Sequence, residues 1–349
     1  MATYYVREQG AVVRKQDERL IVMKDGDTVA EIPLHQLDQL VVMGNIQLTT
    51  PVMALLLKSA VDVVFMSLGG RVRGRLMANE SKFAELRLKQ LQAMSDARAN
   101  LALAKPIVVG KLTNQRAFLL HATPPPPGPL PRLMTGEGVL RSGQIEKSAR
   151  GIAEMAERAK SADNADSLRG FEGKAGAWYW PAFKVLLKND MGFANRVYFP
   201  STDPINALLS FGYALLQKDV TASVQLVGLD TYLGFFHTVQ YGRPSLALDL
   251  MEQFRPLVVD PLVVDLVNRD VIGPGDFIRG ADKAKPVLLK EDAVKRVIQS
   301  YEERITAMVR YPLTGEQATY RRCIELQTRQ LARVVKGETP AYQPMTNGE

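Results

Sequence analysis

Cysteine is almost absent from this chain of 349 residues. Cys323 is the only one, which excludes a disulfide scaffold and every zinc or iron–sulfur site that needs several thiolates. Such sparing use of cysteine fits the reducing cytosol. Cys323 itself stands in a basic segment without a histidine nearby in the sequence, so we do not expect it to act as a catalytic nucleophile.

Long hydrophobic runs are absent as well. No stretch approaches the roughly 18 uncharged apolar residues that a membrane-spanning helix requires. The first ten residues, MATYYVREQG, contain no apolar signal region. We therefore expect a soluble, cytoplasmic protein that makes no contact with a membrane.

The motifs of several common enzyme classes are also missing. The chain has no Gly-Lys-Ser/Thr phosphate loop, no dinucleotide-binding Gly-x-Gly-x-x-Gly and no Gly-x-Ser-x-Gly elbow. Histidine is scarce, with three in the whole chain. We expect structural roles for His35, in a β-rich region, and for His121, which precedes a proline cluster. His237 is the histidine whose neighbouring residues indicate a functional site.

The composition that remains is that of a globular protein. Apolar residues make up 46% of the chain, enough for ordinary buried cores, and the length favours two domains. Lysine and arginine number 44 against 37 acidic residues, a formal charge of +7. This excess serves solubility, or it indicates a polyanionic partner, of which nucleic acid is the commonest.

Residues 1–78 are predicted to form a small β-rich domain. Asp25-Gly26 is a hairpin signal between two β-favouring runs. One short helix is expected after Thr49-Thr50, where a proline occupies its first turn. The expected strands are Tyr4–Arg7, Ala11–Arg14, Arg19–Met23, Leu40–Met43, Val61–Ser67 and Arg71–Met77, and the expected helix is Pro51–Ser59.

Helical periodicity dominates the remainder of the chain. We expect a linker and first helix at 79–100, then an all-α domain at 101–337, with an interruption near Lys105-Pro106. The proline cluster 124–131 is predicted to be an exposed, polyproline-like loop. Residues 338–349 are polar and contain prolines, which predicts a disordered tail. The fold class is therefore α+β.

The segment 232–256 carries the strongest chemical signal. His237 is followed by a Gly-Arg-Pro turn and then by an apolar run that is expected to be helical from Ser245. On such a helix Asp249 and Glu252, three residues apart, lie on the same face. Imidazole with carboxylates and no thiolate suits manganese or magnesium acting on phosphates. Two simpler explanations stay open: a hydrogen-bonded core histidine, and an ion pair between Glu252 and Arg255.

A third ligand has to come from elsewhere in the helical region, and Glu172 is the best candidate. It lies in the segment LRGFEGKAGAWYWPAF, among small residues that allow close approach and ahead of the bulkiest aromatic cluster in the chain. A carboxylate in such surroundings is expected to be partly buried and to need a partner. An ordinary salt bridge to a basic side chain is the alternative.

Several segments together resemble the CRISPR-associated endonuclease/integrase family of spacer acquisition, the Cas1 proteins. The resemblance spans about residues 3 to 335. It rests on LRGFEGKAGAWYW, NRVYFPSTDPINALLSFGYALL and LVGLDTYLGFFHTVQYGRPSLALDLMEQFRPLVVD, with further matches at GNIQLTTPVMALLLKSAVDVVFMSLGGRVRGRL and KLTNQR. The glycine-flanked Glu172, the Asp-Pro-x-Asn-Ala-Leu-Leu motif and His237 with its two following acids are the most specific parts.

The resemblance implies a site, a reaction and partners. One Mn²⁺ or Mg²⁺ ion would be bound by Glu172, His237 and Glu252, with Asp249 as a supporting acid or phosphate-side contact. The protein would be a homodimer that acts on double-stranded DNA with the small Cas2 protein. Its reaction would insert short foreign DNA into a repeat array by phosphodiester transesterification. The proline cluster 124–131 departs from the family pattern.

Two other functions remain open at the level of sequence. One is a metal-dependent nuclease of branched DNA that does not integrate. The other is a non-catalytic DNA-binding scaffold whose acids form only salt bridges. Arg196 and Arg243 are candidate phosphate contacts under the DNA-binding readings.

Overall fold

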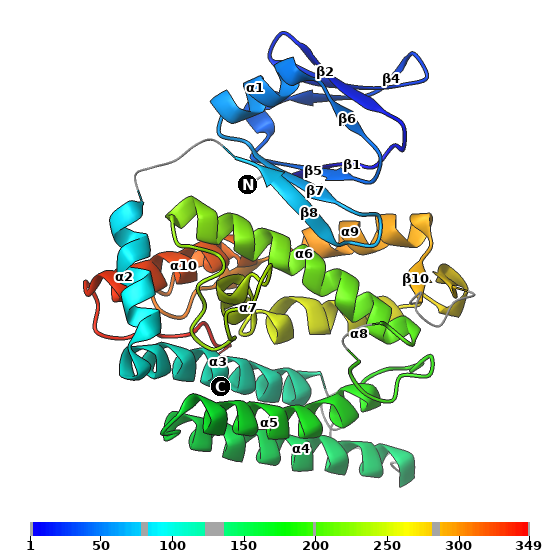
Figure 1. Cartoon of the computed structure of the whole chain (residues 1–349). Coiled ribbons are helices and arrows are strands. Elements are labelled where there is room, and N and C mark those ends of the chain that lie inside the picture. The colour runs from blue at the N-terminus through cyan, green and yellow to red at the C-terminus, as the bar shows by residue number, and fades with distance from the viewer. Residues whose placement is uncertain (1–2, 78–82, 123–135, 198–199, 281–286, 348–349) are drawn as a thin grey trace. The chain divides into compact units, whose positions relative to one another are not determined.

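The structure, a computed structural model, describes residues 3–77, 83–122, 136–197, 200–280 and 287–347. The chain divides into two compact units, residues 1–82 and 83–349, here called the β unit and the helical unit (Figure 1). The expected α+β class, with sheets in the N-terminal part and helices in the C-terminal part, is confirmed. The proline cluster 124–131 lies outside the described residues.

Two four-stranded sheets build the β unit. The first has the strand order β1-β5-β7-β8, parallel except for the last pair, and the second has the order β4-β3-β2-β6. The strands are β1 (Thr3–Val6), β2 (Val12–Gln16), β3 (Arg19–Lys24), β4 (Asp27–Pro33), β5 (Gln39–Met43), β6 (Gln47–Leu48), β7 (Asp62–Met66) and β8 (Val72–Leu76), with η1 (Leu34–Gln36) and helix α1 (Thr50–Lys58). Side chains from both sheets, such as Leu20 and Leu40, form one core with Leu56 of α1.

The predicted hairpin at Asp25-Gly26 is confirmed. These two residues form the turn between β3 and β4, whose strands pair Lys24 with Asp27. Their φ angles are +51° and +95°, the combination that a two-residue turn needs to match the twist of its strands. The sequence analysis missed β4 itself, because this strand lies at a sheet edge and buries only Ile32.

The helical unit is an assembly of long helices with two short strand pairs. Its helices are α2 (Ala84–Ser95), α3 (Ala97–His121), α4 (Gly136–Lys160), α5 (Ala165–Val185), α6 (Pro204–Val227), α7 (Ser245–Met251), the π-helical turn η2 (Arg255–Val259), α8 (Asp260–Asn268), η3 (Pro274–Asp276), α9 (Glu291–Ile305) and α10 (Tyr320–Lys336). Its strands are β9 (Phe277–Ile278), β10 (Leu288–Leu289), β11 (Met308–Arg310) and β12 (Gln317–Thr319). The expectation of a purely α-helical domain was therefore wrong in this detail. No helix in the described ranges is both long and apolar enough to span a membrane.

Helix α3 runs unbroken through Pro106, so the interruption expected there was wrong. The break lies earlier, at Asp96, whose side chain caps α3 by accepting a hydrogen bond from the Ala99 backbone at 2.7 Å. Proline removes one helical hydrogen bond, yet this stretch of α3 is tightly packed. The side chains of Ala104 and Ile107 are fully buried, and α3 packs along both α4 and α5 (Figure 1).

Helix α6 is the most deeply buried long helix among the described elements. Asp203 caps its first turn by accepting a hydrogen bond from the Asn206 backbone at 2.9 Å, with Pro204 at the first helical position. Gly228 ends the helix in the left-handed conformation, with φ of +94°.

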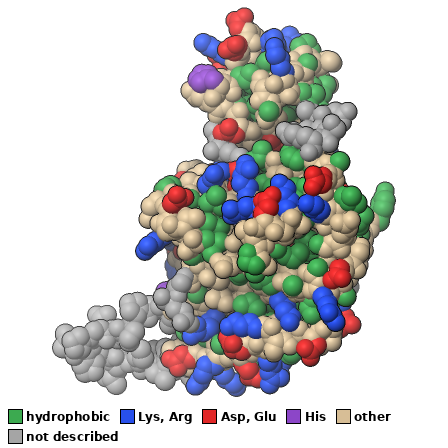
Figure 2. All heavy atoms as spheres, turned by 90° about the vertical axis from the view of Figure 1, so that its left-hand side faces the viewer, with side chains coloured by type: hydrophobic (Ala, Val, Ile, Leu, Met, Phe, Trp, Pro, Cys, Tyr) green, Lys and Arg blue, Asp and Glu red, His purple; other side chains and the backbone are tan. Residues whose placement is uncertain are grey.

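On the face shown in Figure 2, basic and acidic side chains are interspersed, so the charge of +7 does not form a uniform basic surface there.

The disordered tail predicted at residues 338–349 is corrected for the described residues, 338–347. Tyr342 and Met345 are buried. The Met345 backbone donates to the side chain of Gln253 at 2.7 Å, and the Gln253 amide donates to the Tyr342 hydroxyl at 2.7 Å. Asn114 donates to the Met345 carbonyl at 2.9 Å. These partners are remote in sequence, so the polar composition of the segment gave no sign of them.

Replacing Met345 with alanine tests the packing of this segment. Truncating a buried methionine should lower the free energy of unfolding by about 2–4 kcal/mol, measured by urea denaturation. Gln343→Ala, at an exposed side chain in the same segment, serves as the control and should leave the transition in place. Equal transitions for both variants and the parent protein would show that the segment is not packed.

Candidate metal-binding active site

The loop between α6 and α7 carries His237 and passes very close to the start of α7. At Gly234 an added Cβ would lie 2.7 Å from the Ser245 side chain and 2.8 Å from a carboxylate oxygen of Asp249. Only glycine permits this approach. The close packing brings the loop backbone within hydrogen-bonding distance of the acids on and after α7.

The Asp249 carboxylate fixes the loop and the histidine together. Its side chain is fully buried. One oxygen accepts hydrogen bonds from the backbone amides of Phe235 and Phe236, at 2.5 and 3.0 Å. The other accepts from the backbone amide of His237 at 2.8 Å and from its ring Nδ1 at 2.7 Å. Because Nδ1 is held by Asp249, Nε2 is the ring nitrogen left to bind a metal.

Glu252, one residue beyond α7, lies on the other side of the imidazole. Its Oε1 is 3.8 Å from His237 Nε2 and 3.2 Å from Arg255 Nε, and its Oε2 is 2.7 Å from Lys111 Nζ. Burial acts to raise the pKa of Glu252, but Arg255, Lys111 and His237 outweigh it and lower the pKa to about 2. Glu252 is therefore a buried carboxylate that stays ionised.

Lys111 joins Glu252 to Glu172. The lysine lies in α3, and its ammonium also forms a hydrogen-bonded ion pair with Oε1 of Glu172 in α5. Burial acts to lower the pKa of Lys111, but the charges of Glu252 and Glu172 raise it to about 12. One ammonium thus forms ion pairs with two carboxylates that are 80 residues apart in the chain.

A further buried carboxylate, that of Asp260, ties together the helices that carry these groups. Asp260, at the start of α8, accepts hydrogen bonds from the hydroxyls of Tyr179 in α5 and Tyr213 in α6, both at 2.5 Å. Burial raises the pKa of Asp260. The ring of Tyr213 lies under the guanidinium of Arg255, 4.4 Å from ring centre to carbon. Helix α5, which carries Glu172, is thereby held against the segment that follows Glu252.

Comparison with known proteins identifies the family. The protein-family model described as "CRISPR associated protein Cas1" matches residues 4–303 of this chain. The chain belongs to the Cas1 family. It is 35% identical to "CRISPR-associated endonuclease Cas1 2" of Rhodospirillum rubrum, over 98% of this chain and 97% of that protein. It is 34% identical to a Cas4 exonuclease/Cas1 endonuclease fusion of Geobacter sulfurreducens, covering 97% of this chain and 59% of the fusion.

Solved structures share the fold. A casposase bound to an integration product matches with a TM-score of 0.80 at 22% identity, covering 98% of this chain and 93% of that chain. A Cas1 protein from Thermotoga maritima matches with a TM-score of 0.75 at 21% identity, with both chains covered fully. The resemblance inferred from sequence motifs is therefore confirmed at the level of family and fold.

The structure brings the four expected Cas1 site residues into one cluster. His237 contacts Asp249 and has Glu252 on its other side, and Glu172 joins through Lys111. The sequence analysis did not assign Lys111; a lysine within a largely apolar stretch of α3 was the available signal. Arg196, a candidate phosphate contact, donates instead to the Val197 carbonyl and to Asn206.

The donor set suits a hard divalent cation. An imidazole nitrogen and two carboxylates are ligands that manganese and magnesium accept, and a second-shell carboxylate on the other imidazole nitrogen is typical of metal-binding histidines. In the described part of the chain no three such side chains converge as they stand. The Lys111 ammonium lies between Glu172 and Glu252 and acts as a stand-in cation. The residues therefore fit a metal, provided that this ammonium yields its place.

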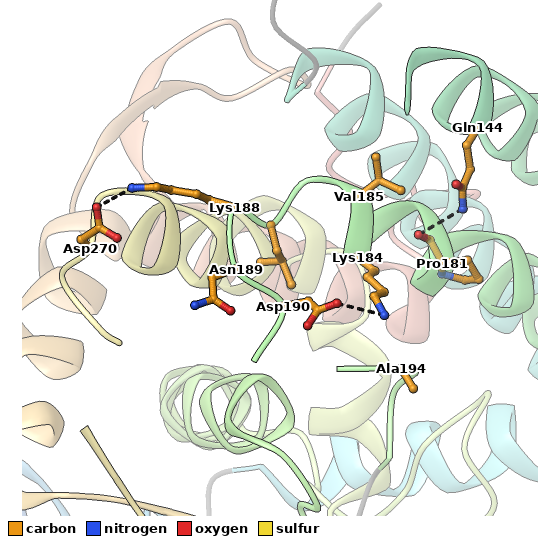
Figure 3. Close-up of a pocket in the computed structure, with 10 residues that line it drawn as sticks. Gln144, Pro181, Lys184, Val185, Lys188, Asn189, Asp190, Ala194 and Asp270 are labelled. Atoms are coloured by element: carbon orange, nitrogen blue, oxygen red, sulfur yellow. Dashed lines mark hydrogen bonds and ion pairs between the residues drawn. The ribbon is translucent and has the colours of Figure 1, made fainter. Parts of the chain in front are cut away.

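A separate surface cavity of about 780 Å³ does not contain any of these groups (Figure 3). Its two lysines are already paired with acids, Lys184 with Asp190 at 3.0 Å and Lys188 with Asp270 at 2.6 Å. The neutralised lysines give the cavity little attraction for phosphate. This cavity therefore gives no support to a second phosphate-binding site.

Asp249→Ala tests whether this carboxylate holds the loop. The substitution leaves three backbone amides and the imidazole without their acceptor, so the free energy of unfolding should fall by about 3 kcal/mol or more. Urea denaturation measures the change. Asp166→Ala, which removes an exposed acid of α5 paired with Arg169, should change the midpoint little. A similar small effect at both positions would refute the organising role of Asp249.

Proposed function

We propose that this chain is a metal-dependent DNA endonuclease/integrase that inserts short foreign DNA into a CRISPR array. The observation that carries the proposal is the imidazole of His237, held at Nδ1 by Asp249 with Nε2 directed toward Glu252. Membership of the Cas1 family, whose relatives are named endonucleases, supports it. So does the shared fold with a casposase bound to an integration product.

Glu172, His237 and Glu252 would hold one Mn²⁺ or Mg²⁺ ion. When bound, such an ion stabilises the negative charge that develops on the oxygens of a phosphodiester under attack. The protein's own part is to keep the Glu252 carboxylate ionised and to hold the imidazole of His237 in the correct orientation. Arg255 and Asp249 do this through their contacts with Glu252 and His237.

The reaction we propose is a direct transesterification. The 3′-hydroxyl of the incoming DNA forms a bond to the phosphorus of a repeat phosphodiester, and the bond from that phosphorus to the repeat 3′-oxygen breaks. The proton lost by the attacking hydroxyl is matched by the proton gained by the leaving oxygen. No covalent enzyme intermediate is needed. Cys323 is unsuited to one, since burial raises the pKa of its thiol to about 11.

The proposed partners are double-stranded DNA, a second copy of the chain in a homodimer, and a Cas2 protein. A solved Cas6-RT-Cas1–Cas2 complex contains a chain whose fold matches this one with a TM-score of 0.81 at 23% identity, over 36% of that longer chain. The net charge of +7 favours a polyanionic partner. We propose that the protein works in the cytoplasm, where the CRISPR array is found.

The test is a strand-transfer assay with a free 3′-end donor DNA and a plasmid that carries a repeat. With Mn²⁺ present, the parent protein should join donor to plasmid, and removing the metal with a chelator should stop the reaction. His237→Ala should lower the rate by about 100-fold or more while DNA affinity stays close to the parent value.

His35→Ala provides the matched control, because this histidine is exposed in the β unit. It should keep the parent rate. If the plasmid is cleaved but no joined product forms, the protein is a nuclease that does not integrate. If parent and variant both bind DNA without any reaction, the protein is a non-catalytic DNA-binding scaffold. Full activity of His237→Ala would overturn the assigned site.

A further inference from the structure

Lys111 occupies an unusual place for a lysine. It lies in α3, three residues after Val108 and directly before Leu112, whose side chains are both fully buried. Only 13% of the lysine side chain is exposed. Its ammonium contacts Glu172 and lies 2.7 Å from Oε2 of Glu252. Both contacts are with the carboxylates proposed as metal ligands, so this inference rests on the proposed function.

The cluster contains cations that contact its carboxylates even without a metal. Lys111 contacts Glu172 and Glu252, and Arg255 contacts Glu252. Without a cation between them, the carboxylates of Glu172 and Glu252 would repel each other. The ammonium of Lys111 offsets this repulsion and holds both carboxylates against one group.

An ammonium and a divalent ion would repel each other if both contacted these carboxylate oxygens. Adding a charge of +2 between the same carboxylates while Lys111 stays would place like charges a few ångströms apart in a buried site, where repulsion is poorly screened. Lysine is suited to yield, because its charge sits at the end of a flexible four-carbon chain. An arginine would present a rigid planar group instead.

We propose that Lys111 is an internal cation that holds the two ligand carboxylates together in the metal-free protein and competes with the metal for them. It thereby weakens metal binding while keeping the empty site assembled. The affinity of this protein for Mn²⁺ is then set by displacement of Lys111 as well as by the ligands themselves.

Lys111→Met tests the proposal, since methionine keeps much of the side-chain volume and removes the charge. Mn²⁺ is titrated into the purified full-length protein without DNA, and the free ion is followed by electron paramagnetic resonance. The variant should bind one Mn²⁺ with a dissociation constant at least about tenfold below that of the parent. Its melting temperature in a chelator should fall, and Mn²⁺ should raise it by more than in the parent.

Matched variants separate this inference from the proposed function. Lys184→Met removes a surface lysine paired with Asp190 and should leave the Mn²⁺ affinity unchanged. Glu172→Gln should weaken binding in either background. Lys111→Arg keeps the charge and should bind Mn²⁺ no more tightly than the parent, a comparison that holds if Lys111→Met fails to fold.

The opposing outcomes are distinct. If the parent binds Mn²⁺ and Lys111→Met binds it equally or more weakly, competition is refuted while the metal site stands. If Lys111→Met fails to fold and Lys111→Arg binds more tightly than the parent, competition is likewise refuted. If neither the parent nor any variant binds Mn²⁺ at millimolar concentration, the metal site and the competition fail together.

Discussion

The buried carboxylate of Asp249 is the interaction on which the site depends. The chain between α6 and α7 has no regular structure of its own, so its backbone amides need acceptors from elsewhere. Asp249 accepts three of them and the imidazole Nδ1 as well. One side chain on a buried helix therefore shapes an irregular loop and orients His237. This explains why the acid belongs to the site without needing to touch a metal.

Charge compensation is the second constraint, and it links elements far apart in the chain. Glu252 remains ionised in a buried position because Arg255 and Lys111 lie beside it. Lys111 carries the link to Glu172 on α5, and Asp260 with its two tyrosine donors holds α5 and α6 against the start of α8. Fold stability and site chemistry thus draw on the same few buried charges.

Features that depend on residues close in sequence were predicted well, and contacts between residues far apart in sequence were not. The turn at Asp25-Gly26 and the pairing of His237 with Asp249 and Glu252 follow from residues close in sequence, where spacing fixes geometry. Glu172 could be nominated only by its small neighbours and by resemblance to a family, because its link to Glu252 runs through a third residue, Lys111.

Three features escaped prediction for the same reason. Lys111 is 61 residues from Glu172 and 141 from Glu252, and the C-terminal segment is anchored by Asn114, some 230 residues earlier. Pro106 does not end α3 because tertiary packing of that helix outweighs one lost hydrogen bond.

The central claim about the site is that Glu172, His237 and Glu252 bind one divalent ion. Crystals grown with Mn²⁺ and measured at the manganese absorption edge test it most directly. The account predicts one anomalous peak among these three side chains, with the Lys111 ammonium withdrawn from them. A protein saturated with Mn²⁺ that shows its peak elsewhere, or none, with Lys111 still bridging Glu172 and Glu252, would contradict it.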